Sequence, residues 1–296
     1  MHTHQDALHP FIFENTPIRG NLAHLNATYL DALQHQALPL LLKKALGELM
    51  TASALLISTL KMDGALILQL QSKGILKLLV VECNSDLEMR ATAKWDEALL
   101  DEAIAEHKPD ATFTQLIAAG QFVITLDPSI GEPYQGIVPI EGNSIAEMLE
   151  NYMLRSQQID TSIWLYCNGE QAAGMLLQKL PNQQAEDVDM WNRVNQLANT
   201  VTDAELTQLA PELLLTRLFH EEQVRLFDPR TTRAFCSCNR DNVANMLTML
   251  GQTEVESIIE EQGSIQIHCD FCNKHYVFDE VEALQLFETP TAPITH

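Results

Sequence analysis

Four of the six cysteines lie in two close pairs near the C-terminal end of the chain, Cys236 with Cys238 and Cys269 with Cys272, and 30 residues separate the pairs. Two pairs of this kind can supply four thiolates to one tetrahedral Zn²⁺. In a reducing cytosol this grouping favours a metal site over a disulfide framework. The spacing therefore predicts one zinc ion per reduced chain, bound by these four sulfur atoms.

The spacing alone favours a purely structural zinc ribbon, which is the common role of a four-cysteine site. Two features argue against that interpretation. The Cys-x-Cys spacing is tighter than usual in ribbons, and oxidation would leave each pair positioned to close a local disulfide, which would consume all four ligands. A unit of about sixty residues has little core, and zinc contributes about 10 to 16 kcal/mol in small zinc-dependent peptides. Loss of zinc is therefore expected to unfold the unit.

The remaining candidate side chains receive more modest roles. His268 and His275 flank the second pair and could replace a cysteine, but four thiolates already complete a tetrahedron, so His275 is expected to support the ligands from outside. Cys83 and Cys167 end apolar runs and are interpreted as inert core thiols, because no base or orienting partner is visible. The chain has no Gly-rich phosphate loop, so the sequence does not support ATP-driven action.

Residues 1–180 show the pattern of an α+β domain. The segment from Leu40 to Leu60 is almost continuously apolar, which predicts a helix buried on all sides. Three apolar runs follow, separated by turn signals, and they predict an antiparallel meander. These runs are Ala65–Gln71, Ile75–Cys83 and Arg90–Trp95.

A second group of strands is expected after the meander. A helix over Ser144–Gln158 interrupts the group, and Ser144 with Glu147 fits a capping box. Asn168-Gly169 predicts a hairpin turn between the last two strands. The strands of this group are Phe122–Leu126, Gly136–Ile140, Ser162–Cys167 and Ala172–Leu180.

Residues 181–230 are predicted to form a helical linker, which the polar stretch Pro181–Asp187 opens. Thr202 with Glu205 forms a capping box, and Pro211 suits the first turn of another helix. Such short helices are marginal in water on their own, so the linker is interpreted as metastable, folded only while it is docked. The apolar positions at helical spacing are Met190, Val194, Leu197, Val201, Leu214, Leu215, Leu218 and Phe219. The fold class is thus α+β: an N-terminal mixed domain with antiparallel sheets and a buried central helix, a helical linker, and a small zinc-binding domain at residues 231–290.

Charge limits the partners. The chain has 18 Lys and Arg against 40 Asp and Glu, a formal net charge of −22. Such a surface repels phosphate backbones and anionic lipid heads, which argues against nucleic-acid and membrane partners. The start of the chain, Met1 to Asp6, lacks the features of a secretory signal, and no apolar segment is long enough to cross a bilayer. The sequence therefore predicts a cytoplasmic protein.

The motifs along most of the chain resemble those of one family, the bacterial redox-regulated holdase chaperones called heat-shock protein 33. The C-terminal pattern around the four cysteines is the specific one. The resembling segments are Lys61-Met62-Asp63-Gly64, Leu79-Val80-Val81-Glu82-Cys83, Tyr134-Gln135-Gly136-Ile137-Val138, Leu218-Phe219-His220-Glu221-Glu222, Asp228-Pro229, Cys236-Ser237-Cys238 and His268-Cys269-Asp270-Phe271-Cys272-Asn273-Lys274-His275-Tyr276.

The resemblance implies a chaperone rather than an enzyme, inactive when reduced and zinc-bound. Oxidative stress would then form the disulfides Cys236–Cys238 and Cys269–Cys272 and release zinc. The zinc-binding domain and the linker would unfold, and the exposed surface would hold unfolding client proteins without ATP. The resemblance also implies that a homodimer forms on activation.

Two other functions compete with this one. A constitutive zinc-ribbon binding module is the alternative. Such ribbons usually bind nucleic acid, but residues 231–287 carry three basic and nine acidic side chains, and this negative charge argues against a nucleic-acid partner. A thiol-disulfide oxidoreductase would use Cys269-Asp-Phe-Cys272, a motif expected in a thioredoxin-like βαβ context. Here the motif lies beside a second cysteine pair, and turnover of small disulfides would distinguish this enzyme from a stoichiometric holdase.

Overall fold

A computed structural model describes residues 6–106, 113–181 and 189–287 of the chain. The chain divides into two compact units, Met1–Phe235 and Cys236–His296. The polar stretch Pro181–Asp187, apart from its proline, lies outside the described residues. Among the helices of the described ranges, none is both long and apolar enough to span a membrane.

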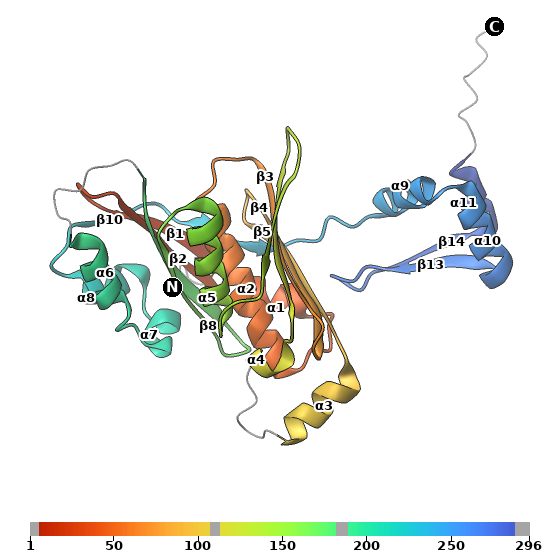
Figure 1. The fold of residues 1–296 in the computed structure, drawn as a ribbon. Coiled ribbons are helices and arrows are strands. Elements are labelled where there is room, and N and C mark those ends of the chain that lie inside the picture. The colour runs from red at the N-terminus through yellow and green to blue at the C-terminus, as the bar shows by residue number, and fades with distance from the viewer. Residues whose placement is uncertain (1–5, 107–112, 182–188, 288–296) are drawn as a thin grey trace, which may run out of the picture. The chain divides into compact units, whose positions relative to one another are not determined.

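The first unit contains two six-stranded sheets with a helix between them (Figure 1). The first sheet has the order β10-β1-β2-β9-β8, with β11 also paired to β1, and its long strands are antiparallel. It is covered on both faces, so β9 is buried at nearly every position rather than at every second one. Its strands are β1 (Asp6–Phe13), β2 (Ile18–Leu25), β8 (Thr161–Cys167), β9 (Ala172–Lys179), β10 (Val224–Leu226) and β11 (Arg230–Thr231).

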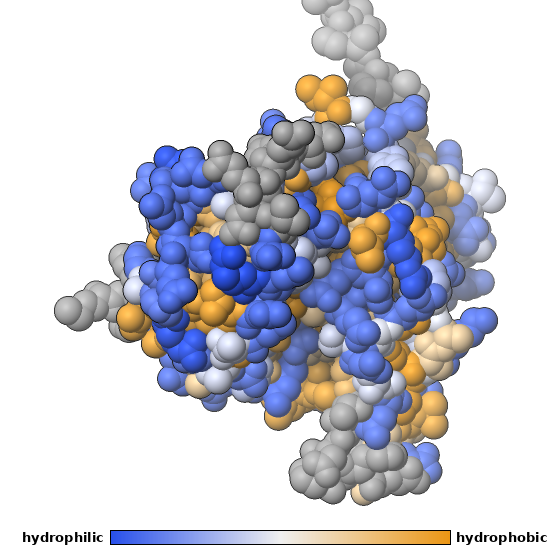
Figure 2. Space-filling view, turned by 60° about the vertical axis from the view of Figure 1, so that its left-hand side comes forward, coloured by the Kyte–Doolittle hydropathy of each residue, from blue (hydrophilic) through white to orange (hydrophobic). Residues whose placement is uncertain are grey.

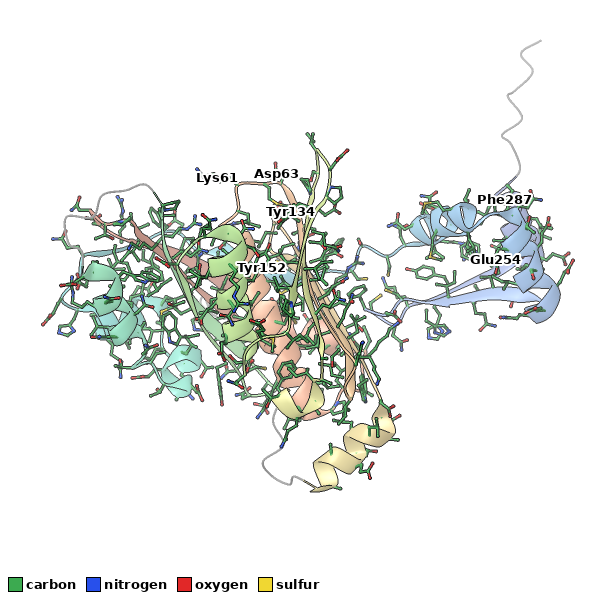
Figure 3. The ribbon with its side chains drawn as sticks, viewed as in Figure 1. Lys61, Asp63, Tyr134, Tyr152, Glu254 and Phe287 are labelled. Atoms are coloured by element: carbon green, nitrogen blue, oxygen red, sulfur yellow. The ribbon has the colours of Figure 1, made fainter. Side chains whose placement is uncertain are left out.

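The second sheet has the order β12-β5-β4-β3-β6-β7. Its long strands pair antiparallel, and only the short β12 runs parallel to β5. Tyr152 lies against β7 at Gly136, where an added Cβ would come within 2.8 Å of the phenol oxygen (Figure 3). The strands are β3 (Gly64–Ser72), β4 (Leu76–Asn84), β5 (Glu88–Trp95), β6 (Gly120–Pro128), β7 (Tyr134–Pro139) and β12 (Arg233–Ala234).

The central helix α2 (Leu40–Ile57) contacts strands of both sheets and forms the middle of the main core. Thirteen of its residues are buried, although Leu40 in the first turn is 57% exposed. The predicted buried helix is thus confirmed, and it ends three residues earlier than expected. The other helical elements around this core are α1 (Ala27–Leu33), α3 (Glu97–Glu106), α4 (Phe113–Leu116), α5 (Ile145–Tyr152) and the π-helical turn Met153–Gln157.

Three short helices cover the face of the first sheet that points away from α2 (Figure 1). They are α6 (Met190–Ala198), α7 (Asp203–Gln208) and α8 (Pro211–Phe219). The capping box of Thr202 and Glu205 is present at the start of α7, and Pro211 occupies the first turn of α8, as predicted. The amphipathic helices of the expected linker therefore lie on the first unit.

The second unit is small. Its described part contains a two-stranded sheet, β13 (Ser264–His268) with β14 (His275–Asp279), and the helices α9 (Arg240–Leu250), α10 (Gln252–Gln262) and α11 (Glu280–Gln285). Six buried residues form its core: Leu247, Val255, Ile259, Ile265, Phe278 and Ala283. This core is small, and domains of this size are often stabilised by a disulfide or a metal ion.

The α+β fold class, the meander β3-β4-β5 and the Asn168-Gly169 hairpin are confirmed. The four predicted strands of the second group are present but divide between the sheets: β6 and β7 extend the meander sheet, whereas β8 and β9 join the first sheet. The strands β1 and β2 were not predicted. Nor were β10, β11 and β12. The segment expected to be a helical linker therefore also supplies β10 and the start of β11, and β12 lies in the segment assigned to the zinc-binding domain. The capping box predicted at Ser144 is present only in part. The Ser144 side chain accepts a hydrogen bond from the amide of Glu147, but the Glu147 carboxylate accepts from the amide of Asn143 rather than from that of Ser144.

The chain carries a formal net charge of −22. Figure 2 shows a face on which hydrophilic residues predominate and hydrophobic ones lie between them in small groups. Like charges on such a surface oppose self-association.

Candidate metal centre

The four paired cysteines converge in the second unit. Their sulfur atoms all lie within 4.8 Å of one another. Two separations join one pair to the other: Cys236 to Cys269 is 3.6 Å and Cys238 to Cys272 is 3.2 Å. Four thiolates at about 2.3 Å from a tetrahedral zinc ion would be about 3.8 Å apart. The donor set and its spacing therefore fit a single metal ion of this kind.

Local backbone structure holds each pair in place. Cys236 and Cys238 precede α9, whose first turn is capped by Asn239 through its side-chain oxygen and the amide of Asn242, at 2.7 Å. This cap fixes the direction in which the chain leaves the first pair.

The second pair lies in the turn between β13 and β14. The amide of Cys269 donates to the carbonyl of Lys274 at 2.9 Å, and Asn273 donates back to the carbonyl of Cys269 at 2.8 Å. Asn273 has a φ of 53°, a left-handed conformation that asparagine tolerates well. The amide of Lys274 also donates to the sulfur of Cys272. The turn thus brings two sulfur atoms to one side of the hairpin.

The electrostatics of the cysteine cluster favour a bound cation. Burial raises the pKa of Cys272 to about 12, and the thiols of Cys238, Cys236 and Cys269 add to the effect, while the Lys274 amide opposes it. Four neighbouring thiolates repel one another, so the fully ionised set is stable only beside a cation. A divalent metal ion would supply that charge.

Tyr276 is a functional residue that the sequence reasoning missed. Its phenol donates a hydrogen bond to the sulfur of Cys238 at 3.2 Å. This contact raises the pKa of Tyr276 to about 12. Tyr276 and Phe278 fall on the inward face of β14 by strand alternation, and an inward tyrosine needs a polar partner, which is the signal that could have identified it.

The two flanking histidines do not join the cluster. Within the described ranges, the only group of three or more side chains suited to hold a metal comprises the four cysteines. His268 and His275 face each other across the hairpin instead, with ring centroids 3.9 Å apart. The expectation that His275 supports the ligands was wrong. Strand alternation places His275 on the opposite face of β14 from Tyr276, and Tyr276 is the residue that contacts a cysteine sulfur.

Cys83 and Cys167 are buried in the first unit, as expected of core thiols. Burial raises the pKa of Cys83 to about 12 and also raises that of Cys167. Both thiols are therefore protonated near neutral pH and are poor nucleophiles.

The chain is similar to known proteins along most of its length. The profile of the Hsp33 protein family matches residues 6–279. A 33 kDa chaperonin from Methylobacillus flagellatus is 55% identical over 287 residues, covering 96% of this chain and 95% of that protein. A 33 kDa chaperonin from Chromobacterium violaceum is 49% identical over the same length and the same shares.

The fold is also similar to a solved structure. The crystal structure of the 33 kDa chaperonin (heat shock protein 33 homolog) from Thermotoga maritima matches with a TM-score of 0.80 and 21% identity, covering 96% of this chain and 98% of that one. The structural match supports the fold, and the family profile with the close relatives identifies the chain. The protein belongs to the Hsp33 family of chaperones.

Proposed function

We propose that this chaperone is a redox-regulated, ATP-independent holdase, which is inactive when reduced and zinc-bound and is activated by oxidation. The protein is a chaperone and not an enzyme, in keeping with its relatives, which are named chaperonins. In the inactive form the client-binding surface is covered, and oxidation exposes it. Unfolding proteins are its clients, and the cytoplasm is its compartment.

The covered face of the first sheet carries the proposal. Helices α6, α7 and α8 bury their apolar side chains against that face in one continuous cluster. Separation of the two surfaces would expose apolar residues on both, which is what a holdase needs to bind unfolding proteins. The helices contribute Met190, Val194, Ala198, Leu206, Leu214, Leu215, Leu218 and Phe219, and the sheet contributes Phe11, Phe13, Ile18, Leu22, Ala173, Met175 and Leu177.

A few contacts hold this cover in place. The rings of Phe219 and Phe13 meet edge to face with centroids 5.0 Å apart. The buried His24 donates through Nε2 to the carbonyl of Leu206 at 2.9 Å. The helices have nine, six and nine residues, lengths that are marginal in water without docking. Their order therefore depends on the first sheet.

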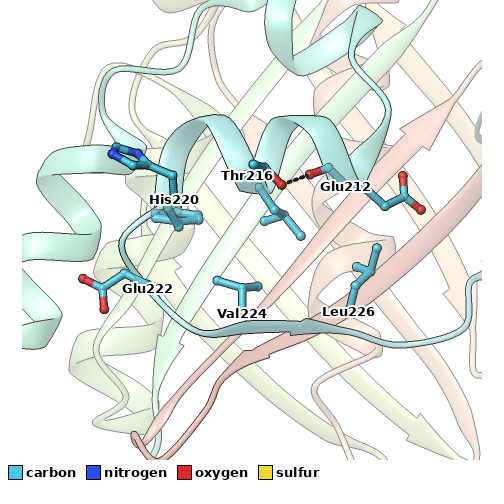
Figure 4. Close-up of a pocket in the computed structure, with 8 residues that line it drawn as sticks. Glu212, Thr216, His220, Glu222, Val224 and Leu226 are labelled. Atoms are coloured by element: carbon cyan, nitrogen blue, oxygen red, sulfur yellow. Dashed lines mark hydrogen bonds between the residues drawn. The ribbon is translucent and has the colours of Figure 1, made fainter.

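The packing of this segment is also incomplete. A groove of about 280 Å³ lies between α8 and β10, and Leu215, Phe219, Val224 and Leu226 line it together with polar side chains (Figure 4). The groove is open to solvent, so the side chains that line it have no protein contacts on that side. We infer that residues 181–230 form the metastable linker, between a core of residues 1–180 and a redox-switch domain of residues 231–290.

The cysteines supply the switch. When bound, a zinc ion would hold Cys236, Cys238, Cys269 and Cys272 as thiolates and cross-link the two halves of the second unit. A two-electron oxidant converts each pair of thiolates to a disulfide, in which neither sulfur remains an effective ligand. The proposed pairs are Cys236 with Cys238 and Cys269 with Cys272, which are neighbours in the chain. Two oxidations thus remove all four ligands from a unit with a very small core.

The chain itself connects the switch to the linker. Cys236 follows directly on Phe235, whose amide donates to the carbonyl of Met89 at the edge of the second sheet at 2.9 Å. Unfolding that starts at Cys236 would loosen β12 first, then β11 and β10, and finally α8. The strands β10, β11 and β12 are two or three residues long, so each step breaks few hydrogen bonds. We further propose that the activated form is a homodimer.

Hydrogen exchange on the two redox forms tests this mechanism. The full chain is prepared reduced with zinc and after oxidation with hypochlorite, with disulfides mapped by mass spectrometry. Residues 190–226 are expected to lose protection on oxidation, whereas α2 and β3 keep theirs. Equal protection of residues 190–226 in both forms would refute the mechanism even if oxidation activates the chaperone.

A further inference from the structure

His268 and His275 form an exposed pair at the turn end of the hairpin in the second unit. They are direct partners in the antiparallel register of β13 and β14. Their ring centroids are 3.9 Å apart and the rings are inclined by 68°. Two imidazoles on adjacent strands are thus within reach of each other, and both are exposed to solvent.

The backbone explains why the rings are so close. The next pair along the strands is hydrogen-bonded, because the amide of Cys269 donates to the carbonyl of Lys274 at 2.9 Å. Antiparallel pairs alternate between hydrogen-bonded and non-hydrogen-bonded types, so the histidines form a non-hydrogen-bonded pair. In that type the Cα atoms are only about 4.5 Å apart and the side chains approach most closely.

The pair lies on the opposite face of the hairpin from the thiol cluster. Ile265 and Phe278 are buried, Ile267 and Tyr276 are partly buried, and all four belong to the core of the unit. His268 directly follows Ile267 and His275 directly precedes Tyr276, so strand alternation points both histidines toward solvent. A ligand at the histidine pair would be separate from one at the cysteines.

The chemistry of this pair suits a metal ion. Imidazole nitrogens bind Zn, Cu, Fe and Ni ions, and two nitrogens at about 2.0 to 2.1 Å from one ion are at most about 4 Å apart. Residues 236–287 carry nine acidic and two basic side chains, so the surrounding field attracts cations. We propose that His268 and His275 form a second metal site, for a divalent transition metal of the imidazole-binding class, with water completing its coordination.

Ni²⁺ is the appropriate probe, because it does not oxidise thiolates. Equilibrium dialysis of the reduced, zinc-loaded full chain against Ni²⁺ measures stoichiometry and affinity. The start of the chain contains His2 and His4, so both are replaced by Asn in all proteins tested. One Ni²⁺ per chain is expected, with the zinc content unchanged and no thiolate-to-nickel charge-transfer absorption.

The variants His268→Gln and His275→Gln are each expected to weaken Ni²⁺ binding about tenfold or more. The matched variant His220→Gln removes an imidazole that is 66% exposed in the first unit, and it should bind Ni²⁺ like the parent. NMR adds a direct readout, since paramagnetic Ni²⁺ should broaden the amide signals of residues 266–268 and 275–277. Absence of Ni²⁺ binding in the parent, or unchanged binding in both hairpin variants that retain the NMR spectrum of the fold, would overturn the proposal.

Discussion

The phenol of Tyr276 donates a hydrogen bond to the sulfur of Cys238 across 3.2 Å. A sulfur that accepts a hydrogen bond carries less free negative charge, and the bond also fixes the direction of its lone pairs. Partners of this kind around metal ligands contribute substantially to metal affinity. Tyr276 is therefore expected to stabilise the reduced state of the switch.

Removing only the phenol oxygen tests that role. In Tyr276→Phe, zinc affinity is expected to fall about 10- to 100-fold, measured by competition with a chromophoric chelator. Tyr134→Phe is the matched control, because Tyr134 lies in the first unit with 52% of its surface exposed. Equal zinc affinity of Tyr276→Phe and the parent would contradict the proposed contribution.

Weakening the packing of helices α6 to α8 on the first sheet, with the cysteines unchanged, should partly activate the reduced protein. Phe219 is 1% exposed and packs on Phe13, so Phe219→Ala should cost about 3 to 5 kcal/mol of docking stability. Hydrogen exchange should then show loss of protection in α8 of the reduced form, with measurable suppression of client aggregation.

The same helix offers a control for this change. Leu213 is 57% exposed, and Leu213→Ala should leave both measurements unchanged. If Phe219→Ala loosens α8 but the reduced protein still does not bind clients, then the covered face is not the client-binding surface.

The two core cysteines should remain unreactive while the four cysteines of the second unit react. Burial raises the pKa of Cys83 to about 12, and alkylation requires the thiolate. After chelation of metal at pH 8, iodoacetamide is expected to modify four thiols quickly and Cys83 and Cys167 slowly, as mass spectrometry can resolve. Modification of all six at comparable rates would show that the first unit opens with the second.

Glu48 on the central helix should make stability depend on pH. Burial raises its pKa from 4.5 to about 7, the Asp203 carboxylate adds to the effect, and Lys44 opposes it. Because the folded-state pKa is above the unfolded one, folding carries no penalty below about pH 4.5, and the penalty grows as pH rises through 7. Above pH 7 the penalty amounts to about 3 kcal/mol.

Glu48→Gln removes the charge that must be buried. Its free energy of unfolding in urea should exceed that of the parent by about 2 to 3 kcal/mol at pH 8 and by little at pH 4.5. The variant Glu102→Gln on the exposed side of α3 serves as control. A difference between Glu48→Gln and the parent that does not change with pH would contradict the assignment.

Local patterns predicted most of the fold of the first unit. The helix α2 and the meander β3-β4-β5 were predictable because burial on all sides and short turns leave clear signatures in the sequence. The strands β1 and β2 were not, because their sheet is buried on both faces and their sequence includes Pro10, Gly20 and Asn21, which are uncommon within strands. The assignment of β6 to the meander sheet depends on its pairing with the distant β3, which no local pattern encodes.

The four metal-ligand candidates were predictable because the spacing of cysteines along the chain is itself the signal of a four-cysteine metal site. The contacts around them were not. Tyr276 reaches Cys238 across 38 positions in the chain, and His275 faces away from the cluster only because of the register of β13 and β14. Such relationships follow from strand pairing rather than from distance along the sequence.

Light scattering of a thermally unfolding client, without ATP, tests the central claim most directly. The same preparation is assayed reduced with zinc and oxidised by hypochlorite, at equal molar ratio to the client. Oxidised protein is expected to suppress aggregation and reduced protein to leave it unchanged, with suppression lost when the disulfides are reduced again and zinc is restored. Equal suppression by the two redox forms would contradict the switch.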